Sequence, residues 1–222
     1  MSQELKQQLA DCIRMLEAAE IIDYNGHASI RLDDGNILIN TGSCQRSRLT
    51  ADDICTIDLE AKQLDDKPSA PLERHLHCGI YRVRPDVKAI VHAHPKWSTI
   101  LTMAGAPYLP VYAQGSLVHP VPLLDSPNSI NNRAMADKLA GVLGDRPAAL
   151  LKAHGAVTVG ADIVEAFVLA AYMEENASRQ YLAMQVGTPY VFSDEEMRLC
   201  REKLWNRTLF QRAWDHFKAK LA

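Results

Sequence analysis

Several features that mark membrane, secreted or repeat proteins are missing from this sequence. No apolar run approaches the ~20 residues that a transmembrane helix needs, so we expect no membrane span. The first residues do not show the basic segment followed by an apolar stretch that marks a secretory signal. No internal repeat, low-complexity tract or Pro/Gly/Ser-rich linker divides the 222 residues, which predicts a single domain over 1–222.

Cysteine and net charge are also low. The five cysteines are scattered, odd in number and never spaced as Cys-x-x-Cys. This pattern favours reduced thiols in a cytoplasmic protein over a disulfide framework. The net charge of −3 gives no reason to expect a nucleic-acid-binding surface. Hydrophobic residues make up 47% of the chain, which is typical of a soluble globular protein with a sizeable core.

The periodicity of apolar residues predicts helices interspersed with short strands. Helices are expected at 3–20, 72–84, from about 95, from Asn128 or Ser129 to about 143, at 162–186 after a cap at Asp162, and, as the last one, from the capping box at 193–196. Strands are expected at 28–32, 37–39, 54–59, 89–94, near 111, and at 117–121, 148–153 and 156–159. The turn Asp33-Asp34-Gly35-Asn36 predicts a hairpin of the first two strands. Such a mixture indicates a mixed sheet covered by helices.

Two histidines end an apolar strand, in the run Ala89-Ile90-Val91-His92-Ala93-His94-Pro95. Because strand side chains alternate between faces, His92 and His94 point the same way. His154 ends a second short apolar strand, and Glu73 lies in the helix before the first one. Three imidazoles can hold a divalent metal with open positions, as in catalytic sites, and a carboxylate can complete the shell or act as acid and base. Taken alone, each residue also fits a buried, hydrogen-bonded histidine or a solvated glutamate.

An ordered set of motifs along nearly the whole chain marks a known family. The motifs are Gly26-His27-Ala28-Ser29-Ile30-Arg31, Thr41-Gly42, Glu73-Arg74-His75-Leu76-His77, Arg84-Pro85-Asp86, His92-Ala93-His94, His154-Gly155 and Glu174. Together they resemble the class II aldolase/adducin-head family. The resemblance implies an α/β fold, a three-layer α/β/α sandwich around a mostly antiparallel sheet.

The same resemblance implies a metal site and an assembly. It implies that His92, His94 and His154 bind a divalent metal, usually zinc, with manganese or cobalt as alternatives. Glu73 is implied to be the catalytic acid/base or a fourth ligand. A homotetramer with active sites between subunits, acting on a small molecule, is implied as well.

Two positions depart from the phosphate-sugar aldolases of this family. Those enzymes carry Gly-Asn where this chain has Gly26-His27, and paired serines where it has Pro71-Leu72. Proline has no N–H and leucine has no polar group, so neither side chain replaces the lost phosphate donors, although Thr41-Gly42 remains. The Gly-His form instead resembles a branch that contains decarboxylases of hydroxylated aromatic and pyridine dicarboxylic acids. We therefore expect an unphosphorylated hydroxy- or oxo-carboxylic acid as substrate.

The resemblance also suggests residues that contact the substrate. Those expected near it are His27, Arg31, Thr41 and Gly42. Arg31 suits a carboxylate because its planar fork can donate two hydrogen bonds. Tyr112 matches a tyrosine near the aldolase active site and is a candidate proton donor. Structural alternatives are a turn-stabilising His27, a surface Arg31 and a Tyr112 ring packed on the sheet.

Decarboxylation and aldol cleavage share one electronic problem, because both leave a carbanion beside an oxygen-bearing carbon. A metal chelated by the substrate withdraws charge as the carbanion becomes an enolate, and a nearby acid protonates carbon. We therefore expect a metal-dependent carbon–carbon lyase, with decarboxylation favoured. The alternatives are an aldolase (aldehyde-lyase) acting on a ketose phosphate or related hydroxy-ketone, an epimerase or dehydratase of the same family, and a metal-free interaction module. The retained histidines and Glu73 argue against the last of these.

Aromatic residues near the C-terminus suggest where subunits meet. They are Trp205, Phe210, Trp214 and Phe217. Trp214 and Phe217 lie three apart, on one helix face. We expect an interface there, with packing of a terminal helix on its own core as the alternative.

Overall fold

A seven-stranded sheet forms the centre of the molecule, with the strand order β3-β2-β1-β4-β7-β6-β5. The computed structural model describes residues 2–221. The strands are β1 (His27–Arg31), β2 (Ile37–Asn40), β3 (Ile54–Ile57), β4 (Ala89–Ala93), β5 (Leu123–Leu124), β6 (Ala148–Leu151) and β7 (Gly155–Gly160). Neighbouring strands are antiparallel except β5 and β6, so the expected mostly antiparallel sheet is confirmed.

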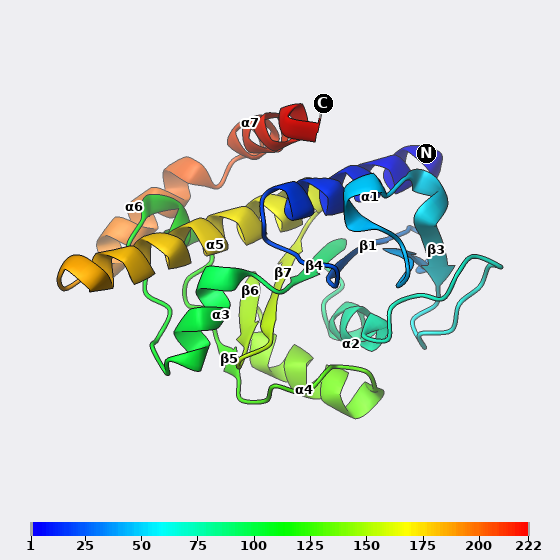
Figure 1. The fold of residues 1–222 in the computed structure, drawn as a ribbon, viewed down its shortest axis with the longest axis horizontal. Helices are drawn as coiled ribbons and strands as arrows, with labels where there is room; N and C mark the ends of the chain where they lie inside the picture. The colour runs from blue at the N-terminus through cyan, green and yellow to red at the C-terminus, as the bar shows by residue number, and fades with distance from the viewer. Residues whose placement is uncertain (1, 222) are drawn as a thin grey trace.

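Helices cover both faces of this sheet (Figure 1). On one face lie α1 (Ser2–Ala18), α3 (Lys96–Met103), α5 (Ile163–Val186) and α7 (Arg207–Lys218), with α6 (Asp194–Leu204) beside them. On the other face lie α2 (Arg74–Val83) and α4 (Arg133–Leu143). Two buried apolar clusters fill the two interlayer spaces, so the three-layer α/β/α sandwich is confirmed. Within residues 2–221 no helix combines the length and hydropathy that crossing a bilayer requires.

Local signals at helix and strand ends explain why these elements form where they do. The side chain of Asp162 accepts the N–H of Glu165 at the start of α5, and Ser193 forms the predicted capping box with Glu196 at the start of α6. The predicted hairpin is present as the antiparallel pair β1 and β2. In each case the deciding contact lies within a few residues along the chain, where sequence patterns are most informative.

Four predicted elements were wrong in type or extent. The segments near 111 and at 117–121 are not strands: the first is irregular, and a short 3-10 helix, η3 (Ala113–Leu117), lies between them. The buried amide oxygen of Asn176 accepts the N–H groups of Val111 and Tyr112, so α5 takes the place of a strand partner. The last helix is two helices, because Asn206 caps a new one, α7, through the N–H of Leu209. Helix α4 begins later than expected, with Asn132 as its cap.

The C-terminal aromatic residues pack mostly inward. Phe210 and Trp214 are 1% and 4% exposed. The ring of Phe167 in α5 makes edge-to-face contacts with Trp214 and Phe217, at centroid distances of 5.4 and 5.2 Å. Phe210 and Trp214 therefore offer no face to a neighbouring subunit, and the predicted interface through these aromatics was wrong for both. Trp205 remains 40% exposed.

Candidate metal centre

Four side chains from separate segments meet at one end of the central strands. His92 and His94 lie at the end of β4, Glu73 directly precedes α2, and His154 lies in the turn between β6 and β7. One ligand atom from each of the four lies within 4.8 Å of the others. The ring centroids of the three histidines are 5.2, 5.3 and 5.1 Å apart. The structure thus brings together the four residues that the sequence suggested as a metal site.

Close approach of two strands places His154 beside the other histidines. Strand β7 pairs with β4 from Ala93 opposite Ala156 onward, and Gly155 starts that strand. A Cβ on Gly155 would lie 2.3 Å from the carbonyl oxygen of Ala93, which no side chain tolerates. Glycine at this position therefore lets the turn that carries His154 close onto the end of β4.

The nitrogen atoms that face the middle of this cluster have no hydrogen-bond partner. His92 Nδ1 lies 3.0 Å from the carbonyl oxygen of Ala156, which accepts a hydrogen bond and so fixes the ring proton on Nδ1. His92 Nε2 then carries a lone pair, is buried without a hydrogen-bond partner, and lies 3.5 Å from Glu73 Oε2. His94 Nε2 is buried and unpartnered as well. An imidazole lone pair and a carboxylate repel each other, and a cation bound between them removes this repulsion. These residues therefore fit a divalent metal ion.

Glu73 is held in its ionised form at this site. Its Oε1 accepts the N–H of Ile130 at 2.8 Å and lies 3.6 Å from His154 Nε2. Burial raises the pKa of the Glu73 carboxyl. The imidazoles of His154 and His92 beside it have the larger combined effect, and the pKa lies well below its ordinary value. A carboxylate that stays charged at neutral pH can serve as a metal ligand or as a proton acceptor.

A cavity of about 610 Å³ opens beside Glu73. His27, Gly42 and Leu72 line it, whereas Thr41 is buried behind its wall with its N–H bonded to the carbonyl oxygen of Asp53. A neighbouring hollow of about 850 Å³ shares Gly42 with this cavity and reaches His94. Of the four predicted substrate-binding residues, His27 and Gly42 therefore lie on the cavity and Thr41 supports it.

Within one chain the structure places Arg31 away from the two hollows beside the cluster, so its contact with a substrate carboxylate stays a prediction. His27 and Arg31 are the first and last residues of β1, and they lie about 13 Å apart along the strand. The Arg31 guanidinium donates to the carbonyl oxygen of Tyr81 and lies over the Tyr81 ring, 4.6 Å from its centroid. Arg31 thus stacks on the C-terminal part of α2, because a short motif in sequence becomes an extended strand in space.

Tyr112 lies away from the four-residue cluster within one chain. Its ring lies under the guanidinium of Arg179, at 4.1 Å from the ring centroid, and its N–H is held by Asn176. Neither cavity beside the cluster is lined by Tyr112. The proton-donor role of Tyr112 stays a prediction that needs a neighbouring subunit.

Two buried residues of this site were missed by sequence reasoning. Arg46 is 6% exposed, lines both hollows, and donates to the carbonyl oxygens of Gly26 and Cys44 at 3.1 and 2.7 Å. No carboxylate forms an ion pair with Arg46 among residues 2–221. His77 is fully buried and lies 2.6 Å from His27. The available signals were an arginine shortly after Thr41-Gly42 and a histidine at the end of the Glu73 motif.

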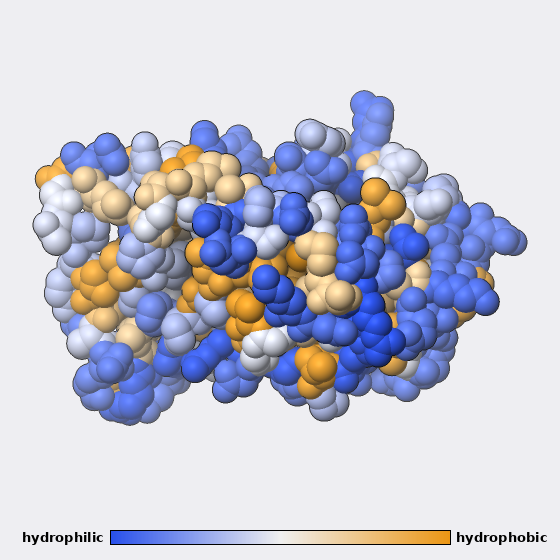
Figure 2. Space-filling view, turned by 90° about the horizontal axis from the view of Figure 1, so that it is seen from below, coloured by the Kyte–Doolittle hydropathy of each residue, from blue (hydrophilic) through white to orange (hydrophobic). Residues whose placement is uncertain are grey.

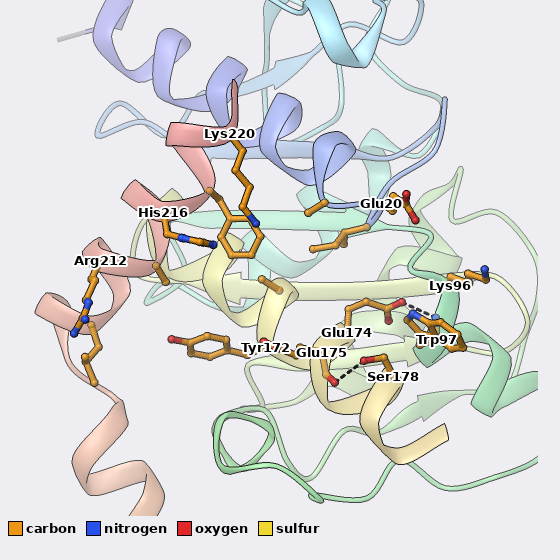
Figure 3. Close-up of a pocket in the computed structure, with 16 residues that line it drawn as sticks. Glu20, Lys96, Trp97, Tyr172, Glu174, Glu175, Ser178, Arg212, His216 and Lys220 are labelled. Carbon is orange, nitrogen blue, oxygen red and sulfur yellow. Dashed lines mark hydrogen bonds between the residues drawn. The ribbon is translucent and has the colours of Figure 1, made fainter. Parts of the chain in front are cut away.

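Glu174 ties α5 to the segment that follows His94. Its carboxylate accepts the N–H of Trp97 at 2.5 Å (Figure 3) and the N–H of Ser98 at 2.9 Å, both in the first turn of α3. The N-cap residue of this helix is Pro95, whose side chain cannot accept a hydrogen bond, so Glu174 accepts these N–H groups instead. Burial raises the pKa of Glu174, and the two N–H donors only partly oppose it. The groove in Figure 3 carries charges of both signs and joins the hollow beside His94 through Lys96.

Comparisons with known proteins agree with this geometry. The family model "Class II Aldolase and Adducin N-terminal domain" matches residues 7–181. The chain is 29% identical over 220 residues to a 3,4-dihydroxyphthalate decarboxylase of Arthrobacter keyseri, covering 89% of this chain and 85% of that protein. It is 30% identical over 184 residues to a 5-methylthioribulose-1-phosphate/5-deoxyribulose-1-phosphate aldolase of Rhodospirillum rubrum, covering 80% of each. An aldolase II superfamily protein from Pseudomonas syringae has the same fold, with a TM-score of 0.87 at 20% identity over 99% of this chain and 92% of that chain.

Proposed function

Because this chain belongs to the class II aldolase and adducin N-terminal domain family, a family of lyases, we propose that it is a divalent-metal-dependent carbon–carbon lyase. The observation that carries the proposal is the convergence of His92, His94, His154 and Glu73, with buried imidazole nitrogens that have no other partner. Zinc is the metal we favour, because imidazole and carboxylate are among its usual donors. Manganese and cobalt are the alternatives.

The chain's own groups divide the work of such a reaction. His92, His94 and His154 would hold the metal, with Glu73 beside them. When bound, the metal supplies a Lewis acid that stabilises negative charge on a substrate oxygen. Oε1 of Glu73 is engaged by the N–H of Ile130, which leaves Oε2 to take up and return a proton.

The cavity wall favours an anionic substrate group near Arg46. A buried guanidinium without an acidic partner is unfavourable unless an anion offsets its charge. Arg46 lines the same cavity as Pro71 and Leu72, which offer no side-chain hydrogen-bond donor. We therefore propose an unphosphorylated hydroxy- or oxo-carboxylic acid as substrate, with its carboxylate near Arg46 and decarboxylation as the reaction.

A second candidate is aldol cleavage of a ketose phosphate. The hydroxyl-bearing residues Ser43, Ser69 and Ser129 line the cavity together with Arg46. The sequence comparison considered only Pro71-Leu72, where phosphate-sugar aldolases have paired serines, and did not include these three hydroxyl donors. They would suit phosphate oxygens, and one relative is an aldolase of sugar phosphates by its name. An epimerase or dehydratase would use the same metal and the same Glu73.

A parallel assay of the zinc-loaded protein tests the proposal. One panel contains hydroxylated aromatic and sugar-derived acids, scored for released carbon dioxide, and the other contains ketose phosphates, scored for aldehyde. We expect carbon dioxide from an acid. Efficient cleavage of a ketose 1-phosphate with no turnover of any acid would move the assignment to the aldolase. No turnover in either panel by protein with full metal content would overturn the lyase assignment itself.

The variant Glu73→Gln separates the role of its carboxylate from that of the metal. Loss of a positioned acid/base lowers kcat by about 100-fold or more, and we expect that loss here. Glu60→Gln is the matched control, because the side chain of Glu60 is exposed and pairs with the equally exposed Arg133. Wild-type turnover by Glu73→Gln across the pH range would leave Glu73 with a structural role.

We further propose that the chain forms a cytoplasmic homotetramer with the cavity between subunits. The surface supports an interface at one end of the molecule. Figure 2 shows apolar patches on the side where α3 and the C-terminal part of α5 lie. The exposed apolar residues of this end include Met103, Leu182, Met184, Val186 and Tyr190. Contiguous exposed apolar surface is typical of sites where one protein contacts another.

A further inference from the structure

A chain of buried hydrogen bonds leads from His27 into the space between β1 and α2. Nδ1 of His27 lies 2.6 Å from Nε2 of His77, and Nδ1 of His77 lies 2.7 Å from Oγ of Ser29. That hydroxyl lies 2.8 Å from the hydroxyl of Tyr81. The four side chains are 4%, 0%, 0% and 2% exposed, in the same order. Only His27 lines the cavity, so water does not reach His77, Ser29 or Tyr81, and the contacts among these side chains decide where their protons reside.

The direction of donation along this chain of hydrogen bonds is set at Tyr81. The Tyr81 hydroxyl can donate to Ser29 Oγ at 2.8 Å or to the carbonyl oxygen of Lys88 at 3.4 Å. That carbonyl already accepts the N–H of Arg31 at 2.8 Å, so the shorter contact to Ser29 is preferred. The guanidinium of Arg31 over the Tyr81 ring also makes the phenol a better donor and a poorer acceptor. Tyr81 therefore donates to Ser29.

The remaining proton positions follow one after another along the hydrogen bonds, from Ser29 to His27. The Ser29 hydroxyl has no hydrogen-bond acceptor other than His77 Nδ1 and the Tyr81 oxygen among residues 2–221, so it donates to His77. His77 is neutral, because its side chain is fully buried and this burial is the main cause that lowers its pKa to about 3. Its single proton is then on Nε2, which donates to His27 Nδ1. The proton of a neutral His27 is left on Nε2.

Nε2 of His27 faces a different environment from Nδ1. Among the described residues no hydrogen-bond partner contacts it, and His27 lines the cavity that reaches Glu73. His27 is also outside the group of four metal-ligating candidates. Its second nitrogen is therefore available to a molecule in the cavity.

We propose that Tyr81, Ser29 and His77 hold His27 in its Nε2–H form, so that His27 donates a hydrogen bond to an acceptor oxygen of the substrate. Tyr81, Ser29 and His77 are then positioning residues that act through His27. The inference rests on the proposed function only in taking this cavity as the substrate site, and it holds for decarboxylation and for aldol cleavage alike. It assigns a substrate with an acceptor oxygen, such as a carboxylate or phosphate oxygen, at this wall.

Nuclear magnetic resonance of the zinc-loaded protein with 15N-labelled histidine tests this directly. Two-bond 1H–15N correlations distinguish a protonated ring nitrogen from a bare one, and a His27→Gln spectrum assigns the His27 signals. We expect a bare Nδ1 and a protonated Nε2 at neutral pH. The opposite tautomer would overturn the proposal, and this result needs no change to Tyr81, Ser29 or His77.

Two tyrosine variants test whether the far end of the chain sets this tautomer. Tyr81→Phe removes the hydroxyl that starts the chain, and we expect a shift of the His27 signals toward a mixture of tautomers. Tyr108→Phe is the matched control, because Tyr108 is also buried but donates to the carbonyl oxygen of Met173 at 3.1 Å. Equal behaviour of the two variants would overturn the role of Tyr81. If the wild-type tautomer is as expected but neither substrate panel is turned over, the proposed reaction fails and the hydrogen-bond chain stands.

Discussion

At the scale of single residues, His92 connects the sheet to the candidate metal centre. Its Nδ1 bonds to Ala156 on the neighbouring strand, and its Nε2 faces Glu73. We predict that His92→Ala falls well below the roughly one divalent ion per chain expected of such a site. Elemental analysis of purified protein measures this, with His216→Ala in α7 as the control. Full metal content in His92→Ala would rule out His92 as a ligand.

Arg46 provides a second prediction at this scale, because its charge is buried beside the cavity. Arg46→Met keeps the length of the side chain and removes the charge. We expect KM for a carboxylate substrate to rise about tenfold or more, since hydrogen bonds between charged groups are among the stronger ones. Arg46→Lys should recover part of the loss. The exposed Arg198, on α6, supplies the control variant Arg198→Met, and an unchanged KM in Arg46→Met would remove Arg46 from substrate binding.

The buried His77 predicts how stability depends on pH. Its pKa is about 3 in the folded chain, against 6.5 for a free side chain. Between these values the unfolded chain binds a proton at His77 and the folded chain does not, so stability falls as the pH drops below 6.5. We expect about 2 kcal/mol of this contribution to be lost by pH 5. Urea unfolding of wild type and His77→Gln at pH 7 and pH 5 measures the difference, and parallel pH profiles would contradict it.

At the scale of elements, the contact of β7 with β4 depends on Gly155. An added Cβ would press on the carbonyl oxygen of Ala93 at 2.3 Å. We predict that Gly155→Ala lowers the free energy of unfolding by about 1–3 kcal/mol and weakens metal binding, because His154 moves with its turn. The control is Gly141→Ala in α4, which has open space around it and should gain up to about 1 kcal/mol. Calorimetry and metal titration read both effects, and a fully stable, metal-saturated Gly155→Ala protein would contradict the argument.

Sequence patterns predicted the elements whose deciding contacts are local. The caps at Asp162 and Ser193 and the hairpin of β1 and β2 belong to this class. The irregular segment before η3 could not be predicted, because its backbone is held by Asn176, more than 60 residues away along the chain. A backbone partner so distant leaves no local pattern.

The same distinction holds within the candidate site. His92 and His94 were recognisable because an apolar strand rarely ends in two imidazoles. Arg46 was not, because its burial follows from the loops that meet around it and not from its neighbours in sequence. The distance of Arg31 from His27 has the converse reason, since a residue close to His27 in sequence lies at the other end of the same strand.

At the scale of the whole molecule, the exposed apolar end predicts self-association. We expect light scattering to give a mass about four times the 24.7 kDa of one chain. Val186 is 90% exposed near that end, and Val186→Glu should reduce the mass if the patch is the interface. The single domain over 1–222 also stays a prediction. A stable monomer at working concentration would contradict the tetramer.

The histidines of the candidate metal centre and the walls of the cavity beside it come from different kinds of structure. His92, His94 and His154 stand at the ends of paired central strands, whereas residues 42–45 and 69–72 form loops at the cavity. Loops accept substitutions that paired strands do not. Over evolutionary time a lineage with this architecture can therefore exchange one substrate for another while it inherits the three histidines of the candidate metal centre unchanged. Descent from one ancestral scaffold would then yield both decarboxylases and aldolases, each distinguished by a few loop residues.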